Sequence, residues 1–226
     1  MTDSALRTAT ILFDSATRAL VRLAASIAGG TELDVRTALG ETGRASTPPE
    51  WVEEVLLQSY LFCGFPRTLN AAREWRRTQT AQGQGQRAGQ DADRQVDQHA
   101  PQGATVAGDH QLAGEATCER VYGRFYERLR HNIAQLHPEL DAWMIVEGYG
   151  KVLSRPALDL GRRELCIVAA CAASGQDRQL HSHLHGARNV GVDDEAIGAA
   201  LAGLEGAVDA ANLERARALW AKVKGT

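Results

Sequence analysis

The feature that most constrains the fold of this 226-residue chain is a similarity between two of its own segments, 145 residues apart. Residues 17–75 align with residues 162–220 without a gap. Identical residues at equivalent positions include Arg18 and Arg163, Gly30 and Gly175, Leu56 and Leu201, and Trp75 and Trp220. A gapless register that keeps glycine and tryptophan favours duplication over chance. The sequence therefore predicts two related repeats.

Both repeats are predicted to be helical. Segments 18–30 and 162–175 are apolar on most faces and end in glycine, which is typical of a buried helix with a left-handed C-terminal residue. Thr47 and Pro48 have the character of a helix N-terminus, with Glu50 three residues after Thr47. Aromatic residues make up only 5% of the chain and alanine is abundant, which favours closely packed helices. We therefore predict an all-α fold.

Residues 76–114 separate the two blocks and differ from both in composition. The stretch is rich in Gln, Gly, Ala and Asp and has almost no large apolar residues. It cannot bury enough surface to offset the entropy lost on ordering. We predict a first repeat over 1–75, a flexible polar linker over 76–114 that is helical in part at most, and a second repeat over 115–226.

Composition and charge argue against several classes of protein. The formal net charge is −3 and no basic block occurs, so we expect no nucleic-acid binding. The N-terminus lacks a basic region followed by an apolar run, and no stretch of eighteen apolar residues occurs, so neither a signal peptide nor a membrane span is expected. We expect a cytoplasmic protein with reduced cysteines.

Three histidines at alternate positions, His181, His183 and His185, raise the question of a metal site. On a helix, residues four apart share a face, so His181 and His185 converge while His183 lies about 200° around the axis from His181. A strand would place all three on one face, but the following residues continue as a helix end and turn. No third ligand for the 181/185 pair is evident, and we predict no bound metal.

Glu164 and His183 are the two residues best suited to catalysis. They lie nineteen residues apart in a predicted helical hairpin with its turn near 175–177. A carboxylate beside an imidazole forms a general acid–base pair. The alternative is that Glu164 caps its helix and His183 is an ordinary interior histidine. Upstream, the aromatics Tyr122, Phe125 and Tyr126 recur at helical spacing and are predicted to be core or subunit contacts.

Several short motifs resemble those of a known family. The second block contains Arg155-Pro156-x-Leu158, Arg163-Glu164-Leu165, and a His-x-x-Gly-Ala segment that starts at His183 and is followed by Asn189-x-Gly191-Val192. The first block contains an aromatic-x-Gly-x-Pro turn over residues 62–66. Together these resemble the carboxymuconolactone decarboxylase family, within the alkylhydroperoxidase D-like superfamily. The resemblance implies the alkylhydroperoxidase D-like helical fold.

The resemblance also implies a site. The peroxidase branch of the superfamily has a Glu followed by a CxxC pair and a His, at spacings of twelve, fifteen and nineteen. Here Glu164 and His183 match the ends, but Gln176 and Gln179 replace the cysteines, which disfavours disulfide cycling. The resemblance points to decarboxylation of a small carboxylated lactone without metal or cofactor. In that reaction His183 is the acid–base group, Glu164 orients it, and Arg155 or Arg163 anchors the substrate carboxylate.

The first block departs from this pattern, because Ala19 and Ala38 stand where the second has Glu164 and His183. We expect a structural half that offers its Gly-x-Pro turn to a pocket around His183. Two other functions stay open: a thiol redox protein that uses Cys63, Cys166 or Cys171, and a non-enzymatic binding or assembly module. Oligomeric relatives and the duplication together imply a homo-oligomer, most simply a trimer of two-repeat chains.

Overall fold

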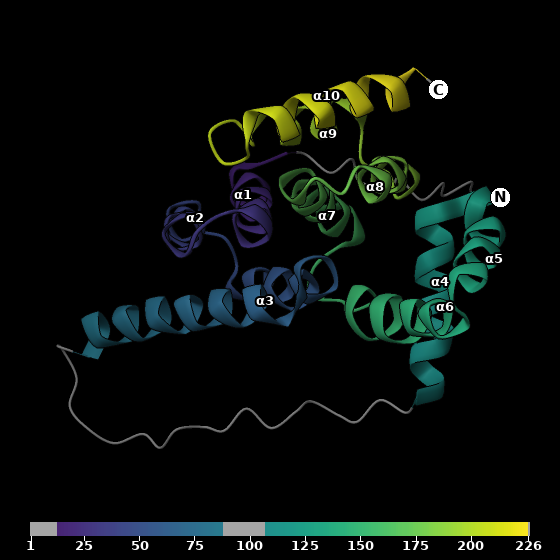
Figure 1. The fold of residues 1–226 in the computed structure, drawn as a ribbon. Coiled ribbons are helices and arrows are strands. Elements are labelled where there is room, and N and C mark those ends of the chain that lie inside the picture. Colours follow the sequence, from purple (N-terminus) through teal and green to yellow (C-terminus); the bar gives the residue numbers. More distant parts are fainter. Residues whose placement is uncertain (1–12, 88–106, 226) are drawn as a thin grey trace, which may run out of the picture.

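The computed structural model describes residues 13–87 and 107–225 (Figure 1). Every regular element in these ranges is a helix, which confirms the predicted all-α class. The elements are α1 (Ser15–Gly29), α2 (Glu32–Arg44), α3 (Pro49–Arg87), α4 (Ala107–Tyr122), η1 (Gly123–Phe125), α5 (Tyr126–Leu136), α6 (Pro138–Trp143), η2 (Met144–Leu153), α7 (Leu160–Ser174), α8 (Asp177–Asn189), α9 (Asp194–Ala202) and α10 (Ala210–Lys224). None of the described helices is both long and apolar enough to cross a membrane.

Helices α1 and α7 form the centre of the molecule and run in the same direction, between α3 and α10 (Figure 1). At their N-termini, the Arg162 guanidinium lies 3.2 Å from Asp14 Oδ2 and donates to Thr17 Oγ1 at 2.9 Å. At their C-termini, a Cβ on Gly29 would lie 2.9 Å from the Ala173 carbonyl oxygen. The leucine, isoleucine and alanine side chains between these ends are almost fully buried, so this pair anchors the core.

The helix bounds of the two blocks coincide under the register predicted from the sequence. A shift of 145 residues places α1 on α7, α2 on α8, and the first residue of α3 on the first residue of α9. The same shift places Gly64 on Asp209, the N-cap of α10. Gly64 has φ 75° and ψ 166°, a conformation reserved for glycine, and it divides α3 at this point. The coincidence supports the predicted duplication.

Helical structure extends into the predicted linker from both sides. Helix α3 continues to Arg87 and α4 begins at Ala107, so only residues 88–106 of the 76–114 stretch lie outside the described residues. Two glycines, one in α4 and one in η2, allow these elements to pack closely. A Cβ on Gly114 would lie 2.2 Å from the Ile145 carbonyl oxygen, and a Cβ on Gly150 would lie 2.0 Å from that of His110. Helix α4 therefore lies directly against η2, although its first residues share the polar composition of the stretch.

Candidate active site around His183 and Glu164

The α7–α8 hairpin brings together the two residues that the sequence singled out. Helix α7 ends at Gly175, which has φ 68° in the left-handed region, and α8 begins two residues later. Across the hairpin, His183 Nδ1 lies 2.8 Å from Glu164 Oε2. The two side chains therefore meet directly within the second block.

The pair is deeply buried. Glu164 is 0% exposed and His183 is 4% exposed. Gly186, one turn after His183, provides the space for the carboxylate, since a Cβ there would lie 2.6 Å from Glu164 Oε2 and 2.8 Å from Val121 Cγ1. Glu164 Oε1 is buried and has no hydrogen-bond partner among the described residues. A buried carboxylate that holds one partner and leaves one oxygen unsatisfied is costly for stability, which is typical of a functional site.

Two aromatic rings from different blocks enclose the imidazole. The Phe62 ring meets it edge-on, with centroids 5.6 Å apart, and the Tyr122 ring lies at 6.3 Å on a tilted plane. Phe62 opens the aromatic-x-Gly-x-Pro turn, so the first block does reach His183, as the sequence analysis expected. Arg67, from the same turn, instead donates to the carbonyl oxygens of Ile27 and Gly30 within the first block.

Tyr122 is a residue of this site that the sequence analysis placed only in the core or at a subunit contact. Its ring packs against Tyr149, with centroids 6.3 Å apart, as well as against His183. Burial raises the pKa of both phenols above the ordinary value, so both hydroxyls are neutral. The helical spacing of the aromatics indicated a buried face. It did not show that Tyr122 would pack against His183.

The geometry assigns different tasks to the two imidazole nitrogens. Nδ1 is engaged by the carboxylate of Glu164, which accepts a hydrogen bond and so favours the tautomer with the proton on Nδ1. Nε2 is then the nitrogen available to take or give a proton. A carboxylate and an imidazole arranged in this way can serve general acid–base catalysis.

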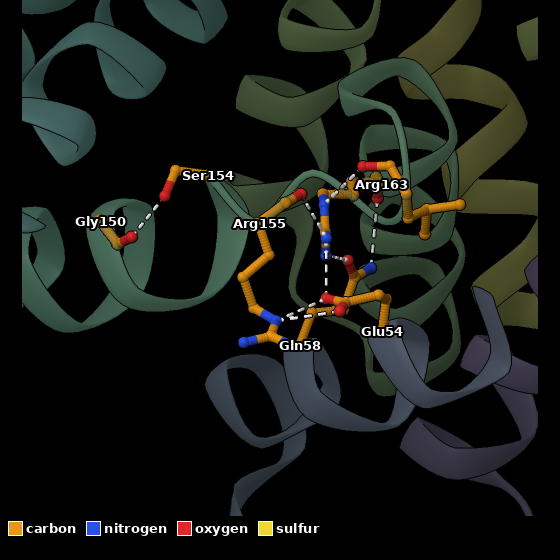
Figure 2. Close-up of polar contacts among 7 residues, drawn as sticks. Glu54, Gln58, Gly150, Ser154, Arg155 and Arg163 are labelled. Carbon is orange, nitrogen blue, oxygen red and sulfur yellow. Dashed lines mark hydrogen bonds and ion pairs between the residues drawn. The ribbon is translucent and has the colours of Figure 1, made fainter. Parts of the chain in front are cut away.

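The structure gives Arg155 and Arg163 a role different from the predicted one (Figure 2). Arg163 is 0% exposed, and its guanidinium donates to Glu54 Oε2 at 2.8 Å and to the Arg155 carbonyl oxygen at 2.9 Å. It also donates to the carbonyl oxygen of Leu158. Arg155 Nε lies 2.9 Å from both oxygens of the same Glu54 carboxylate. The two arginines thus connect the second block to α3 of the first block through ion pairs with Glu54. Neither arginine contacts His183 in the described structure.

His181 and His185 lie on the other side of α8, as helical geometry predicted. Their ring centroids are 5.0 Å apart. Burial and the nearby charges of His181, Arg188 and Arg124 lower the pKa of His185. Among the residues whose side chains are described, no group of three or more His, Cys, Asp or Glu is arranged to hold a metal ion.

The four cysteines are free thiols without the properties of a redox centre. Burial raises the pKa of Cys118, Cys166 and Cys171 to about 12, and burial also raises the pKa of Cys63. Because the thiolate is the nucleophile, these groups are poorly reactive at neutral pH. Gln176 and Gln179, which occupy the CxxC positions of the peroxidase branch, are exposed.

Comparison with known proteins agrees with the resemblance in the second block. Residues 123–222 match the family model described as the carboxymuconolactone decarboxylase family, and the match includes both Glu164 and His183. No curated protein matches the chain. The helical architecture is consistent with the alkylhydroperoxidase D-like fold. The similarity to the carboxymuconolactone decarboxylase family thus covers residues 123–222, which form most of the second block.

Proposed function

We propose that the protein is a cofactor-independent lyase that removes CO2 from a small carboxylated lactone or a related acid by proton transfer at His183. The observation that carries this proposal is the buried pair of His183 Nδ1 and Glu164 Oε2, 2.8 Å apart, which leaves Nε2 as the working nitrogen. The match of residues 123–222 to the carboxymuconolactone decarboxylase family model and the glutamines at both CxxC positions support it.

The proposed reaction uses His183 as the general acid. The bond between the carboxylate carbon and the ring carbon breaks, CO2 leaves, and the electron pair of that bond passes into the conjugated lactone carbonyl. The protonated imidazole then donates its Nε2 proton to the ring carbon and becomes neutral, and it regains a proton from water for the next cycle. Glu164 holds the ring in place and stabilises its charged form.

The surroundings of the pair suit this chemistry. Phe62 and Tyr122 pack against the imidazole and His183 is only 4% exposed, so bulk water has little access to the nitrogen. In a site with little water the charge of the imidazolium interacts more strongly with the reacting carboxylate and with Glu164. Binding of substrate then requires one of the two aromatic side chains to move.

A thiol redox activity, the main alternative, has less support. Such a reaction needs an accessible thiolate, whereas burial raises the pKa of each of the four cysteines, three of them to about 12. A purely structural or binding role would leave the buried acid–base pair without a use.

Measurement of CO2 release from a panel of carboxylated γ-lactones tests the proposal. The panel is incubated with the wild type, with His183→Asn and with the control His131→Asn, which alters an exposed histidine of α5. Loss of a general acid lowers turnover by a factor of about 10² to 10⁴, so His183→Asn is expected to lose that much while the control keeps wild-type rates. Equal rates in all three proteins, or no turnover by the wild type, would count against the proposal and favour a binding module.

A further inference from the structure

A large cleft lies beside the buried pair, on the side of α8 that carries His181 and His185. Its volume is about 1080 Å³, and α8, η1 and α5 form its walls. Small-molecule sites typically measure roughly 300 to 1,000 Å³, so the cleft is large enough for a compact organic ligand. It does not include His183 and is a separate feature from the proposed catalytic pair.

The polar side chains of this cleft are mainly cationic or capable of becoming so. Arg124 from η1, Arg128 from α5 and Arg188 from α8 line it together with His181 and His185. None of the described residues that line it is an aspartate or a glutamate. A cleft lined by charges of one sign concentrates the field and attracts ligands of the opposite sign.

Two of the three guanidinium groups have no carboxylate partner among the described residues. Within the part of the chain that the structure describes, neither Arg124 nor Arg128 has an acidic partner, and both are exposed. Arg188 is partly neutralised, since its Nε lies 3.2 Å from Asp194 Oδ1. The lowered pKa of His185, caused by burial and by its cationic neighbours, agrees with a surplus of positive charge in the cleft.

One wall of the cleft is apolar and flat. The Phe125 ring is 44% exposed, and the Arg124 guanidinium lies 4.8 Å from its centroid. Leu129 from α5 continues this wall. A planar apolar group can pack against the exposed edge of Phe125 and Leu129 while its anionic substituents pair with the surrounding cations.

From these features we infer that the cleft binds a small planar organic molecule with two anionic groups, either carboxylate or phosphate. Guanidinium groups recognise both anions through paired hydrogen bonds. Tyr122 lines this cleft and also packs on His183, so a ligand here lies one side chain from the proposed proton donor. The inference does not depend on the proposed lyase activity, because binding is measured directly.

Calorimetric titration of the full chain with three probes tests the inference. The probes are phthalate, which carries two carboxylates on a planar ring, 1,2-phenylene bisphosphate, which carries two phosphates on the same ring, and phthalamide, the neutral analogue of phthalate. At least one anionic probe is expected to bind with a Kd below about 1 mM, and phthalamide at least about tenfold more weakly. The tighter of the two anionic probes identifies the preferred anion.

Variants connect the binding to the cleft. Arg128→Gln and, independently, His181→Asn are expected to weaken binding about tenfold, a loss typical of a charge-assisted contact. Arg178→Gln, which alters an exposed arginine in the first turn of α8 that does not line the cleft, should bind like the wild type, as should His183→Asn. Undiminished binding in both cleft variants would overturn the inference, as would equal affinity for phthalamide or no binding of either anion.

Discussion

At the scale of single residues, Gly186 determines whether Glu164 can reach His183. A Cβ at this position would lie 2.6 Å from Glu164 Oε2, closer than such atoms approach in proteins, so Gly186→Ala must displace the carboxylate from its partner. We expect Gly186→Ala to lower turnover by at least about tenfold because the imidazole loses its orienting group. Steady-state rates on the substrate identified by the lactone panel measure this effect.

Gly198→Ala is the matched control for that variant. Gly198 also lies within a helix, but its nearest neighbour would be Trp220 Nε1 at 3.8 Å, an ordinary contact. Alanine should therefore stabilise this helix by about 0.5 to 1 kcal/mol and leave turnover unchanged. If the two variants retained equal activity, the space at Gly186 would have no part in the function.

The pairing of Glu164 with His183 could be predicted from the sequence, whereas the role of the arginines could not. The family spacing of nineteen residues selected His183 from three histidines, and helical geometry separated it from the other two. Arg155 and Arg163 share a partner, Glu54, that lies 101 and 109 residues away along the chain. Nothing in a single sequence shows a contact across that separation, so the motif arginines were read as substrate ligands.

At the scale of elements, the close contact of α4 with η2 depends on one glycine of η2. A Cβ on Gly150 would lie 2.0 Å from the His110 carbonyl oxygen and 2.8 Å from its carbon, both of them rigid backbone atoms of α4. We expect Gly150→Ala to destabilise the protein by about 1 to 3 kcal/mol because the helix must move away. Chemical denaturation monitored by circular dichroism gives this value.

Gly148 offers the comparison within the same element. A Cβ there would meet nothing within 4 Å, so Gly148→Ala is expected to change the free energy of unfolding by less than about 1 kcal/mol. A loss in Gly148→Ala as large as that in Gly150→Ala would show that η2 tolerates no side chain at either position, and that the contact with α4 is not the cause.

The bounds of α1 and α7 follow from apolar periodicity, an aspartate N-cap and a glycine after the last residue, and these are local signals. The extent of α3 and α4 was not predictable in the same way. A stretch rich in Gly, Gln and Asp can be a solvated linker, or it can be a helix whose glycine lets a neighbouring helix come close. The composition is the same in both cases. Only the packing of Gly114 and Gly150 distinguishes the two cases, and that packing is a property of the folded molecule.

At the scale of the whole molecule, a buried carboxylate connects the two blocks. Glu54 of α3 accepts from the fully buried Arg163 and from Arg155 of the second block. Glu54→Gln leaves a buried guanidinium without its counter-charge, and we expect the free energy of unfolding to fall by about 3 to 5 kcal/mol. Glu50→Gln, at an exposed position in the first turn of the same helix, should cost under about 1 kcal/mol. Similar losses in the two variants would contradict the assigned role of Glu54.

The surface suggests contacts between copies of the chain. Phe65 on α3 is 62% exposed, and Leu136 and Trp143 near α5 and α6 are 74% and 58% exposed. Large exposed apolar side chains often mark interfaces, which agrees with the proposed homo-oligomer. Light scattering is expected to give a mass of about three times the 24.4 kDa chain, as for a trimer. A mass equal to one chain would contradict the oligomer.

The central claim is that Glu164 holds the Nδ1 proton of His183 and leaves Nε2 for proton transfer. Proton–nitrogen NMR of histidine labelled with nitrogen-15 tests it most directly. We predict a downfield Nδ1 proton, protected from exchange with water, that is present in the wild type and in His131→Asn but absent from His183→Asn and shifted in Glu164→Gln. A His183 proton found on Nε2 of the neutral imidazole, with Nδ1 unprotonated, would contradict the account.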